Sequence, residues 1–313
     1  MSRKVIAIVG GTGAQGSGLA RAILADGDRA FQPRVLTRNP SSEKARALEK
    51  AGAEVVRADV DEPATLAAAF EGAYGAFCVT FFWEHFSAEK EKSHARLLAS
   101  AAKSARVQHV IWSTLEDSRQ WVPVESDTMP TLQGEYKVPH FDAKGEADAY
   151  FADVPTTCLR TSFYWDNAIF FGTGPKPGPD GKLALTMPMG TARLPGIAAE
   201  DIGKCAYGIF KGGAPYIGRT LGIAGEMLTG QEMAAAFTRA LGREVVYNDV
   251  PPDVYRGFGF PGADDLGNMF QVKRDFNAQF CANRSVSASR ELNPDLQSFD
   301  TWLAANKDRI PLE

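Results

Sequence analysis

The segment most informative about the architecture is Gly10-Gly11-Thr12-Gly13-Ala14-Gln15-Gly16, which directly follows an apolar run at residues 4–9. Its first, fourth and seventh residues match the spacing G-x-x-G-x-x-G. Glycines at this spacing permit a tight turn from a strand into a helix and let the backbone approach a pyrophosphate. The free N–H groups at the start of the helix can then hold the phosphates. The segment therefore predicts a dinucleotide-binding turn, with a purely structural glycine turn as the alternative.

The rest of the first half supports this interpretation because strand-like and helix-like segments alternate along it. Strands rich in β-branched residues that alternate with helices predict a parallel sheet wrapped by helices. Right-handed crossovers between such strands give a Rossmann-type, doubly wound α/β fold. The expected strands are residues 4–9, 32–37, 54–58, 75–79, 107–113 and 156–160, and the expected helices are residues 16–25, 42–51, 63–70, 88–104 and 140–151.

The alternation ends after Arg160, and the sequence then predicts a smaller mixed lobe. A Gly/Pro-rich stretch at residues 172–181 cannot form a helix, so we expect an exposed loop or the start of a hairpin there. We therefore assign residues 1–160 to a dinucleotide-binding domain and residues 161–313 to a C-terminal lobe that could share elements with the first sheet. In this lobe, strands are expected at residues 184–187 and 220–223, and helices at residues 199–211, 229–241, 264–280 and 299–306.

Composition and charge exclude several classes of protein. The chain has 313 residues and a formal net charge of −4, so it has no general attraction to nucleic acids or to anionic membranes. No apolar stretch is long enough to span a bilayer or to form a signal peptide. The four cysteines form no CxxC pair and the four histidines do not cluster with them. We therefore expect a cytoplasmic protein with reduced thiols and no bound metal.

The end of the second predicted strand bears on which dinucleotide is bound. It reads Thr37-Arg38-Asn39-Pro40, and no acidic residue follows until Glu43. A site that prefers NAD usually has an acid here, which accepts a hydrogen bond from the ribose 2′-hydroxyl. An arginine instead forms a charge-assisted fork with a 2′-phosphate. Arg38 therefore favours NADP(H), the alternative being an arginine that is only solvated.

Two further strand ends carry polar residues that could contact a nucleotide. Asp59 follows the third strand, where a carboxylate can accept from an adenine amino group, whereas the nearby Asp61 is equally well explained as a helix cap. Thr80 follows the fourth strand, at the edge where ligands of such sheets lie, and could meet a ribose or a diphosphate. The aromatic residues 81–83 after it form either a wall of the cleft or part of the core.

Three segments make the chain resemble the NmrA-like proteins, which are atypical short-chain dehydrogenase/reductases. The resemblance covers nearly the whole chain, and it is closest to the HSCARG type, whose members sense NADPH. The glycine motif is shared by many reductases, but the late segment is more specific. The segments are residues 10–16 with 37–40, then His140-Phe141-Asp142-Ala143-Lys144-Gly145, and Gly259-Phe260-Pro261-Gly262-Ala263-Asp264-Asp265-Leu266-Gly267-Asn268-Met269-Phe270.

The resemblance implies that NADP(H) lies across the carboxyl edge of the sheet. It places Gly11 to Gln15 on the phosphates, Arg38 on the 2′-phosphate and Asp59 near the adenine. It also implies that Thr80 meets the ribose and diphosphate, that Lys144 lies near the nicotinamide ribose, and that Tyr164 or a neighbour closes over the nicotinamide. Family members often carry further basic residues after the Asn-Pro pair, where this chain has two serines, so the selectivity for NADP(H) depends more heavily on Arg38.

The candidate catalytic residues depart from the usual pattern of these reductases. That pattern is Tyr-x-x-x-Lys, in which the lysine orients the ribose and lowers the pKa of the tyrosine that protonates the substrate. Lys144 occupies the lysine position, but four residues earlier stands His140. The nearest tyrosine, Tyr136, is out of helical register with Lys144. His140 is therefore a tentative proton donor, the alternative being a histidine that only begins a helix.

Two functions of different classes follow from this departure. The missing tyrosine favours a protein that binds NADP(H) without turnover and passes the redox state to a regulatory protein partner. The alternative is an NADPH-dependent reductase of small carbonyl, enone or quinone substrates, similar to isoflavone reductases, with Lys144 and His140 as catalytic residues. An apolar rim near Phe258 and Phe260 could serve a homodimer.

Overall fold

The computed structural model describes residues 3–178 and 181–312, and its centre is a seven-stranded sheet. The strand order is β11-β6-β5-β4-β1-β2-β3, and all neighbouring strands are parallel. The order reverses direction between β1 and β4, which makes the sheet doubly wound, as predicted. The strands are β1 (Lys4–Ile8), β2 (Phe31–Thr37), β3 (Glu54–Arg57), β4 (Gly75–Cys78), β5 (His109–Thr114), β6 (Thr156–Arg160) and β11 (Thr220–Gly222).

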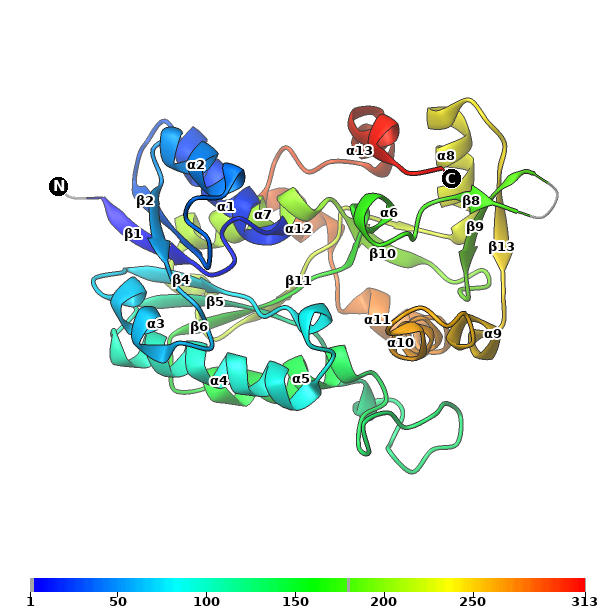
Figure 1. Cartoon of the computed structure of the whole chain (residues 1–313), viewed down its shortest axis with the longest axis horizontal. Helices are drawn as coiled ribbons and strands as arrows, with labels where there is room; N and C mark the ends of the chain where they lie inside the picture. The colour runs from blue at the N-terminus through cyan, green and yellow to red at the C-terminus, as the bar shows by residue number, and fades with distance from the viewer. Residues whose placement is uncertain (1–2, 179–180, 313) are drawn as a thin grey trace.

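Helices cover both faces of this sheet, as Figure 1 shows. Side chains of one set pack in a core with Ile6, Ile8 and Val35, and those of the other set pack in a second core with Ala7, Ala76 and Trp112. Successive strand residues therefore face opposite layers. The first set is α1 (Ala14–Ala25), α2 (Glu43–Lys50), α7 (Ala199–Gly212) and α12 (Val286–Leu292), and the second is α3 (Pro63–Phe70), α4 (Ala88–Ser104) and α5 (Pro139–Ala147).

The C-terminal lobe lies beside the central sheet and contains two small mixed sheets (Figure 1). Its aromatic core includes Trp165, Phe237, Phe299 and Trp302. The sheets are β12-β10-β7 and β13-β9-β8, formed by β7 (Phe163–Tyr164), β8 (Lys176–Pro177), β9 (Leu183–Met187), β10 (Leu194–Ile197), β12 (Glu226–Leu228) and β13 (Val245–Asp249). The helices are α6 (Asn167–Phe170), α8 (Gly230–Leu241), α9 (Pro252–Arg256), α10 (Ala263–Asp275), α11 (Asn277–Ala282) and α13 (Phe299–Asn306).

Some predicted elements differ in detail from those observed. The helix expected over residues 264–280 is interrupted at Phe276, where the Asn277 side chain donates to the carbonyl of Lys273 at 2.9 Å and to that of Arg193 at 2.7 Å. Such local side-chain hydrogen bonds compete with the helical ladder. In the predicted loop at 172–181, β8 pairs with β9 as a hairpin, and Pro179 and Asp180 lie outside the described residues.

The C-terminal half contributes directly to the dinucleotide-binding half. β11 pairs with β6 at the edge of the central sheet, and α7 packs along α1. Within residues 3–178 and 181–312, no helix is long and apolar enough to cross a membrane. The same residues contain no group of three or more His, Cys, Asp or Glu side chains that could hold a metal ion.

Candidate functional site

The glycine-rich turn lies between β1 and α1, at the point where the strand order reverses. Gly10 has a φ of +61°, and its carbonyl accepts from the N–H of Gly13 at 2.8 Å. A Cβ on Gly16 would lie 2.5 Å from that carbonyl, so only glycine permits this turn. Gly13 is the N-cap of α1 and provides no side-chain cap, which leaves the first N–H groups of the helix, from Ala14 on, open to a ligand. The residues present therefore fit the diphosphate of a dinucleotide.

Gln15 connects this turn to two other elements at the same edge of the sheet. Its Nε2 donates to the hydroxyl of Tyr164 on β7 at 2.6 Å, and its Oε1 accepts from the hydroxyl of Ser113 on β5 at 2.9 Å. Burial raises the pKa of the Tyr164 phenol, so the hydroxyl stays protonated at neutral pH. The predicted residues Gln15 and Tyr164 are thus brought together by the fold.

Lys144 and Thr80, two further predicted residues, also meet. Lys144 lies on α5, and its Nζ donates to the Thr80 hydroxyl at 2.6 Å. The same ammonium lies 2.9 Å from Oε1 of Glu91 on α4, a fully buried carboxylate that also accepts from Thr80 at 2.5 Å. Lys144 is therefore held by a carboxylate and a hydroxyl at the end of β4.

Glu91 is ionised in this cluster. Burial by itself would raise its pKa, but Lys144, His85 and Thr80 outweigh burial and hold the pKa of Glu91 at about 2. Its second oxygen lies 3.4 Å from Nε2 of His85, and neither of these two atoms has a hydrogen-bond partner among the described residues. Lys144, which occupies the lysine position of the reductase pattern, therefore forms an ion pair with Glu91. The sequence analysis did not identify Glu91.

His140 is held by a second acid that sequence reasoning also missed. Its Nδ1 lies 2.5 Å from Oδ1 of Asp265 on α10, and its backbone N–H donates to Oδ2 of the same residue at 3.2 Å. Because a carboxylate oxygen lies at hydrogen-bond distance from Nδ1, we assign the hydrogen to Nδ1, and Nε2 is the ring nitrogen that Asp265 does not contact. Both side chains are buried, and the rings of Phe82 and Trp83 pack on the imidazole.

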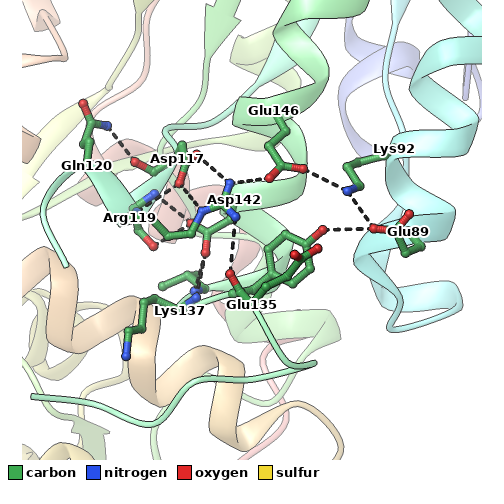
Figure 2. A network of polar contacts seen from close by, with 12 residues as sticks. Glu89, Lys92, Asp117, Arg119, Gln120, Glu135, Lys137, Asp142 and Glu146 are labelled. Atoms are coloured by element: carbon green, nitrogen blue, oxygen red, sulfur yellow. Dashed lines mark hydrogen bonds and ion pairs between the residues drawn. The ribbon is translucent and has the colours of Figure 1, made fainter. Parts of the chain in front are cut away.

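The side chain of Tyr136 pairs with a carboxylate on α4. Its hydroxyl donates to Oε1 of Glu89 on α4 at 3.1 Å. Figure 2 shows the polar network around Glu89, in which Lys92 bridges Glu89 and Glu146, and Glu146 also accepts from Arg119. This network fixes the segment before α5 against α4, and so it positions α5 itself.

Asp142 fixes the start of α5 from inside the same network (Figure 2). Its buried carboxylate accepts from the backbone N–H groups of Ser118, Lys137 and Val138 and from the Ser118 hydroxyl, at 2.6–2.9 Å. Burial raises the pKa of Asp142 above its ordinary value, although the hydrogen bonds from Ser118 and Val138 act against this rise. Within the segment 140–145, which carries the family resemblance, Asp142 therefore has a structural role: it fixes the start of the helix that carries Lys144.

Arg38 and Asp59 lie at the ends of β2 and β3, at the carboxyl edge of the sheet. The Arg38 guanidinium donates to the carboxylate of Glu84, which follows β4. Oδ1 of Asp59 accepts from the N–H of Asp61 at 3.0 Å and so closes the turn after β3. The capping alternative for Asp61 is wrong, because the N-cap of α3 is Glu62, which makes no side-chain cap. Asp61 instead pairs with Lys90 and His94 on α4.

The sequence thus indicated most residues of this edge but none of its three acidic partners. Four of these features directly follow strands of the parallel sheet, whose carboxyl ends share one edge: the glycine turn, Arg38, Asp59 and Thr80. Lys144 lies on α5, and Tyr164 lies in β7 of a smaller sheet. Glu84 and Glu91 belong to no motif. Asp265 lies within the late segment that carries the family resemblance, but nothing in that segment pairs it with His140.

These features together define a protein of the Rossmann-type, dinucleotide-binding class. The pattern of the NmrA-like family matches residues 2–303. The chain therefore belongs to the NmrA-like family, as its resemblance predicted.

Known proteins with similar sequences or structures agree with this assignment. The NmrA-like family domain-containing oxidoreductase FrzB of a Cladobotryum species is 28% identical over 292 residues, covering 89% of this chain and 86% of FrzB. A crystal structure of NmrA, a negative transcriptional regulator, in complex with NAD has a TM-score of 0.78 at 23% identity, covering 97% of this chain and 95% of that chain. Citrobacter triphenylmethane reductase complexed with NADP(H) has a TM-score of 0.73 at 17% identity and covers 97% and 99% of the two chains.

Proposed function

We propose that this protein binds NADP(H) along the carboxyl edge of its central sheet. The open start of α1 supports this proposal, because Gly10 to Gly16, including Thr12, provide a close backbone approach and uncapped N–H groups for the phosphates. Arg38 would hold the 2′-phosphate and Asp59 would lie on the adenine side. NmrA has been crystallised with NAD and with NADP, and the Citrobacter reductase with NADP(H).

The nicotinamide half of the cofactor would lie against three residues. Thr80 would contact the ribose and diphosphate, Lys144 would lie near the nicotinamide ribose, and Tyr164 would close over the ring. The hydrogen bonds of Lys144 to Thr80 and of Gln15 to Tyr164 support this placement, because they already gather these side chains at one edge.

We further propose that the protein acts as a redox regulator that responds to NADPH or NADP+ and signals through a protein partner. The observation that carries this proposal is the position four residues before Lys144, where a buried histidine replaces the tyrosine and is tied to Asp265. No phenol hydrogen-bonds Lys144 among the described residues, and Lys144 is instead neutralised by Glu91. The finer similarity to HSCARG-type sensors stays a prediction.

A reductase is the second candidate, favoured by the pair His140–Asp265. The reduced cofactor, when bound, supplies a hydride. With Nδ1–H held by Asp265, His140 would have to carry a second hydrogen on Nε2, as an imidazolium. It would donate that proton to the oxygen of a carbonyl, enone or quinone substrate and become a neutral imidazole. The curated relatives that match this chain, such as FrzB, are named oxidoreductases.

One set of measurements tests both candidates. Calorimetry with NADPH, NADP+ and NADH measures binding, and NADPH absorbance in the presence of quinones and enones measures turnover. A regulator binds NADP(H) and shows no substrate-dependent oxidation. A reductase shows turnover that falls at least about 100-fold in His140→Phe.

Two controls make the outcome specific. His94→Gln removes another histidine paired with a carboxylate, but one on α4 that contacts Asp61, and it should retain turnover. Turnover that survives in His140→Phe would contradict the catalytic role of His140. A wild-type protein that binds no dinucleotide would contradict both candidates.

The partner prediction concerns the exposed aromatic rim between α9 and α10. Phe258 is 47% exposed and Phe260 is 39% exposed, which is unusual for phenylalanine. Sedimentation of the wild type and of the double variant Phe258→Ser/Phe260→Ser tests the homodimer. The wild type should sediment as a dimer, and the double variant should sediment with half that mass.

A further inference from the structure

The ion pair between Arg38 and Glu84 places a carboxylate where the sequence showed none. Arg38 follows β2 and Glu84 lies in the short 3₁₀ helix η1 (Phe82–Glu84) after β4, so two strand ends that flank β1 meet here. The side chain of Arg38 is 63% exposed and that of Glu84 is 47% exposed, so both are open to a ligand. Glu84 is therefore the acid that the second strand lacks, supplied from a different part of the chain.

A 2′-phosphate and a 2′-hydroxyl would meet this pair differently. A 2′-phosphate that binds Arg38 competes with Glu84 for the guanidinium, and its charge is repelled by the Glu84 carboxylate. A hydroxyl is uncharged and can donate a hydrogen bond to the carboxylate while the ion pair persists. The pair consequently opposes binding of the phosphorylated cofactor but not of the unphosphorylated one.

Two further carboxylates near the ion pair also oppose the binding of a phosphate at Arg38. Asp59 and Asp61 follow β3 and lie close enough to act electrostatically on Arg38. Asp61 is already paired with Lys90 and His94. The Asp59 carboxylate, in contrast, accepts a hydrogen bond from Asp61 within the turn after β3 and has no ion-pair partner in the part of the chain that the structure describes. A phosphate at Arg38 therefore enters a region with more than one carboxylate.

We infer that Glu84 is a specificity-determining residue, which competes with the 2′-phosphate for Arg38 and thereby narrows the preference for NADP(H) over NAD(H). This inference rests on the proposed dinucleotide binding and concerns the selectivity of that same site.

The test is calorimetric titration of the wild type and of Glu84→Gln with two pairs of ligands. The pairs are NADPH with NADH, and the fragments adenosine 2′,5′-bisphosphate with adenosine 5′-monophosphate. Removal of the competing charge should strengthen binding of each 2′-phosphorylated ligand by about fivefold, the effect of one exposed ion pair. Binding of NADH and of adenosine monophosphate should stay the same or weaken.

Glu62→Gln is the matched control. Glu62 is 48% exposed and pairs with Arg57 one strand away, through two hydrogen bonds of 2.7 and 2.8 Å. This variant should leave the ratio of NADPH to NADH affinity unchanged.

Each outcome has a distinct meaning. An unchanged ratio in Glu84→Gln, or equal strengthening of both ligands of a pair, would overturn the role of Glu84 while leaving cofactor binding intact. A wild type that binds neither ligand of either pair would overturn the proposed function itself. In the background Arg38→Gln, the effect of Glu84→Gln on NADPH should become smaller, because no arginine is left to compete for and only the direct repulsion between Glu84 and the phosphate remains.

Discussion

Lys273 and Lys137 are both fully buried, yet their ammonium groups have opposite surroundings. Nζ of Lys137 donates to the carbonyls of Ser126 and Met129 and to the Thr131 hydroxyl, at 2.7–3.1 Å. Nζ of Lys273 lies 3.2 Å from the sulfur of Met269 and among four phenylalanine rings, with no carboxylate within ion-pair distance among the described residues. Burial lowers the pKa of Lys273 to about 7.

We predict that Lys273→Met stabilises the protein. The folded pKa is below that of the unfolded chain, so below pH 7 the full cost of burying the charge is present. Between pH 7 and about 10 the folded lysine is neutral while the unfolded one still binds a proton, and the cost disappears as the pH rises. The gain in the free energy of unfolding should be about 2–4 kcal/mol at pH 6 and small near pH 10. Urea denaturation at the two pH values measures it.

Lys137→Met is the contrasting control, because it removes three hydrogen bonds and leaves buried carbonyls unsatisfied. It should destabilise the protein by about 2–3 kcal/mol at pH 6. If Lys273→Met and Lys137→Met changed the free energy of unfolding equally, the different surroundings of the two ammonium groups would not determine their effect on stability.

At the scale of elements, the crossing of α1 and α7 sets the position of the cofactor helix. α7 belongs to the C-terminal half, and the two helices meet at Gly18 and Gly203. A Cβ on Gly203 would lie 2.1 Å from the backbone nitrogen of Leu19, and one on Gly18 would lie 2.4 Å from the carbonyl of Glu200. The backbones are in contact, so neither position has space for a side chain.

Gly203→Ala should therefore destabilise the protein by about 3 kcal/mol, because the helices must separate to admit the methyl group. Thermal or urea denaturation measures this loss. Gly27→Ala, in the loop after α1, has no atom within 4 Å of the added carbon and should change stability by less than about 1 kcal/mol. A Gly203→Ala protein as stable as Gly27→Ala would show that the crossing is not tight.

At the scale of the whole molecule, a buried ion pair joins the end of β5 to the loop between α11 and α12. Arg284 contacts both oxygens of Glu116 at 2.6 and 2.9 Å, and both side chains are fully buried. The guanidinium also donates to the carbonyl of Thr161 and packs on the ring of Phe280. Together with β11 and α7, this pair joins the two halves, so we expect them to unfold as one cooperative unit.

Glu116→Gln should lower the free energy of unfolding by about 3–5 kcal/mol, because it leaves a buried guanidinium charge uncompensated. Calorimetry should still record a single transition at a lower temperature, since β11 and α7 continue to bind the halves together. Asp300→Asn, which breaks an exposed contact of two hydrogen bonds with Arg239, should cost less than about 1 kcal/mol. Two separate transitions in Glu116→Gln would contradict the shared core.

The sequence by itself determined the local features of this protein. The strand and helix pattern of the first half predicts the doubly wound sheet, because hydrophobic periodicity and glycine spacing are properties of neighbouring residues. The same pattern places Arg38, Asp59 and Thr80 at one edge, because every parallel strand ends there. It was less successful in the C-terminal lobe, where short strands such as Leu194–Ile197 contain proline and glycine and show no period.

Only the tertiary structure decided which partner each of these residues has. Glu84 and Arg38 are 46 residues apart and His140 and Asp265 are 125 apart, and no local pattern links such pairs. Lys144 is recognisable from its place after β5, but its charge is balanced by Glu91 on another helix. Packing of whole elements creates these contacts, so the chemistry of the site depends on distances that the order of residues does not contain.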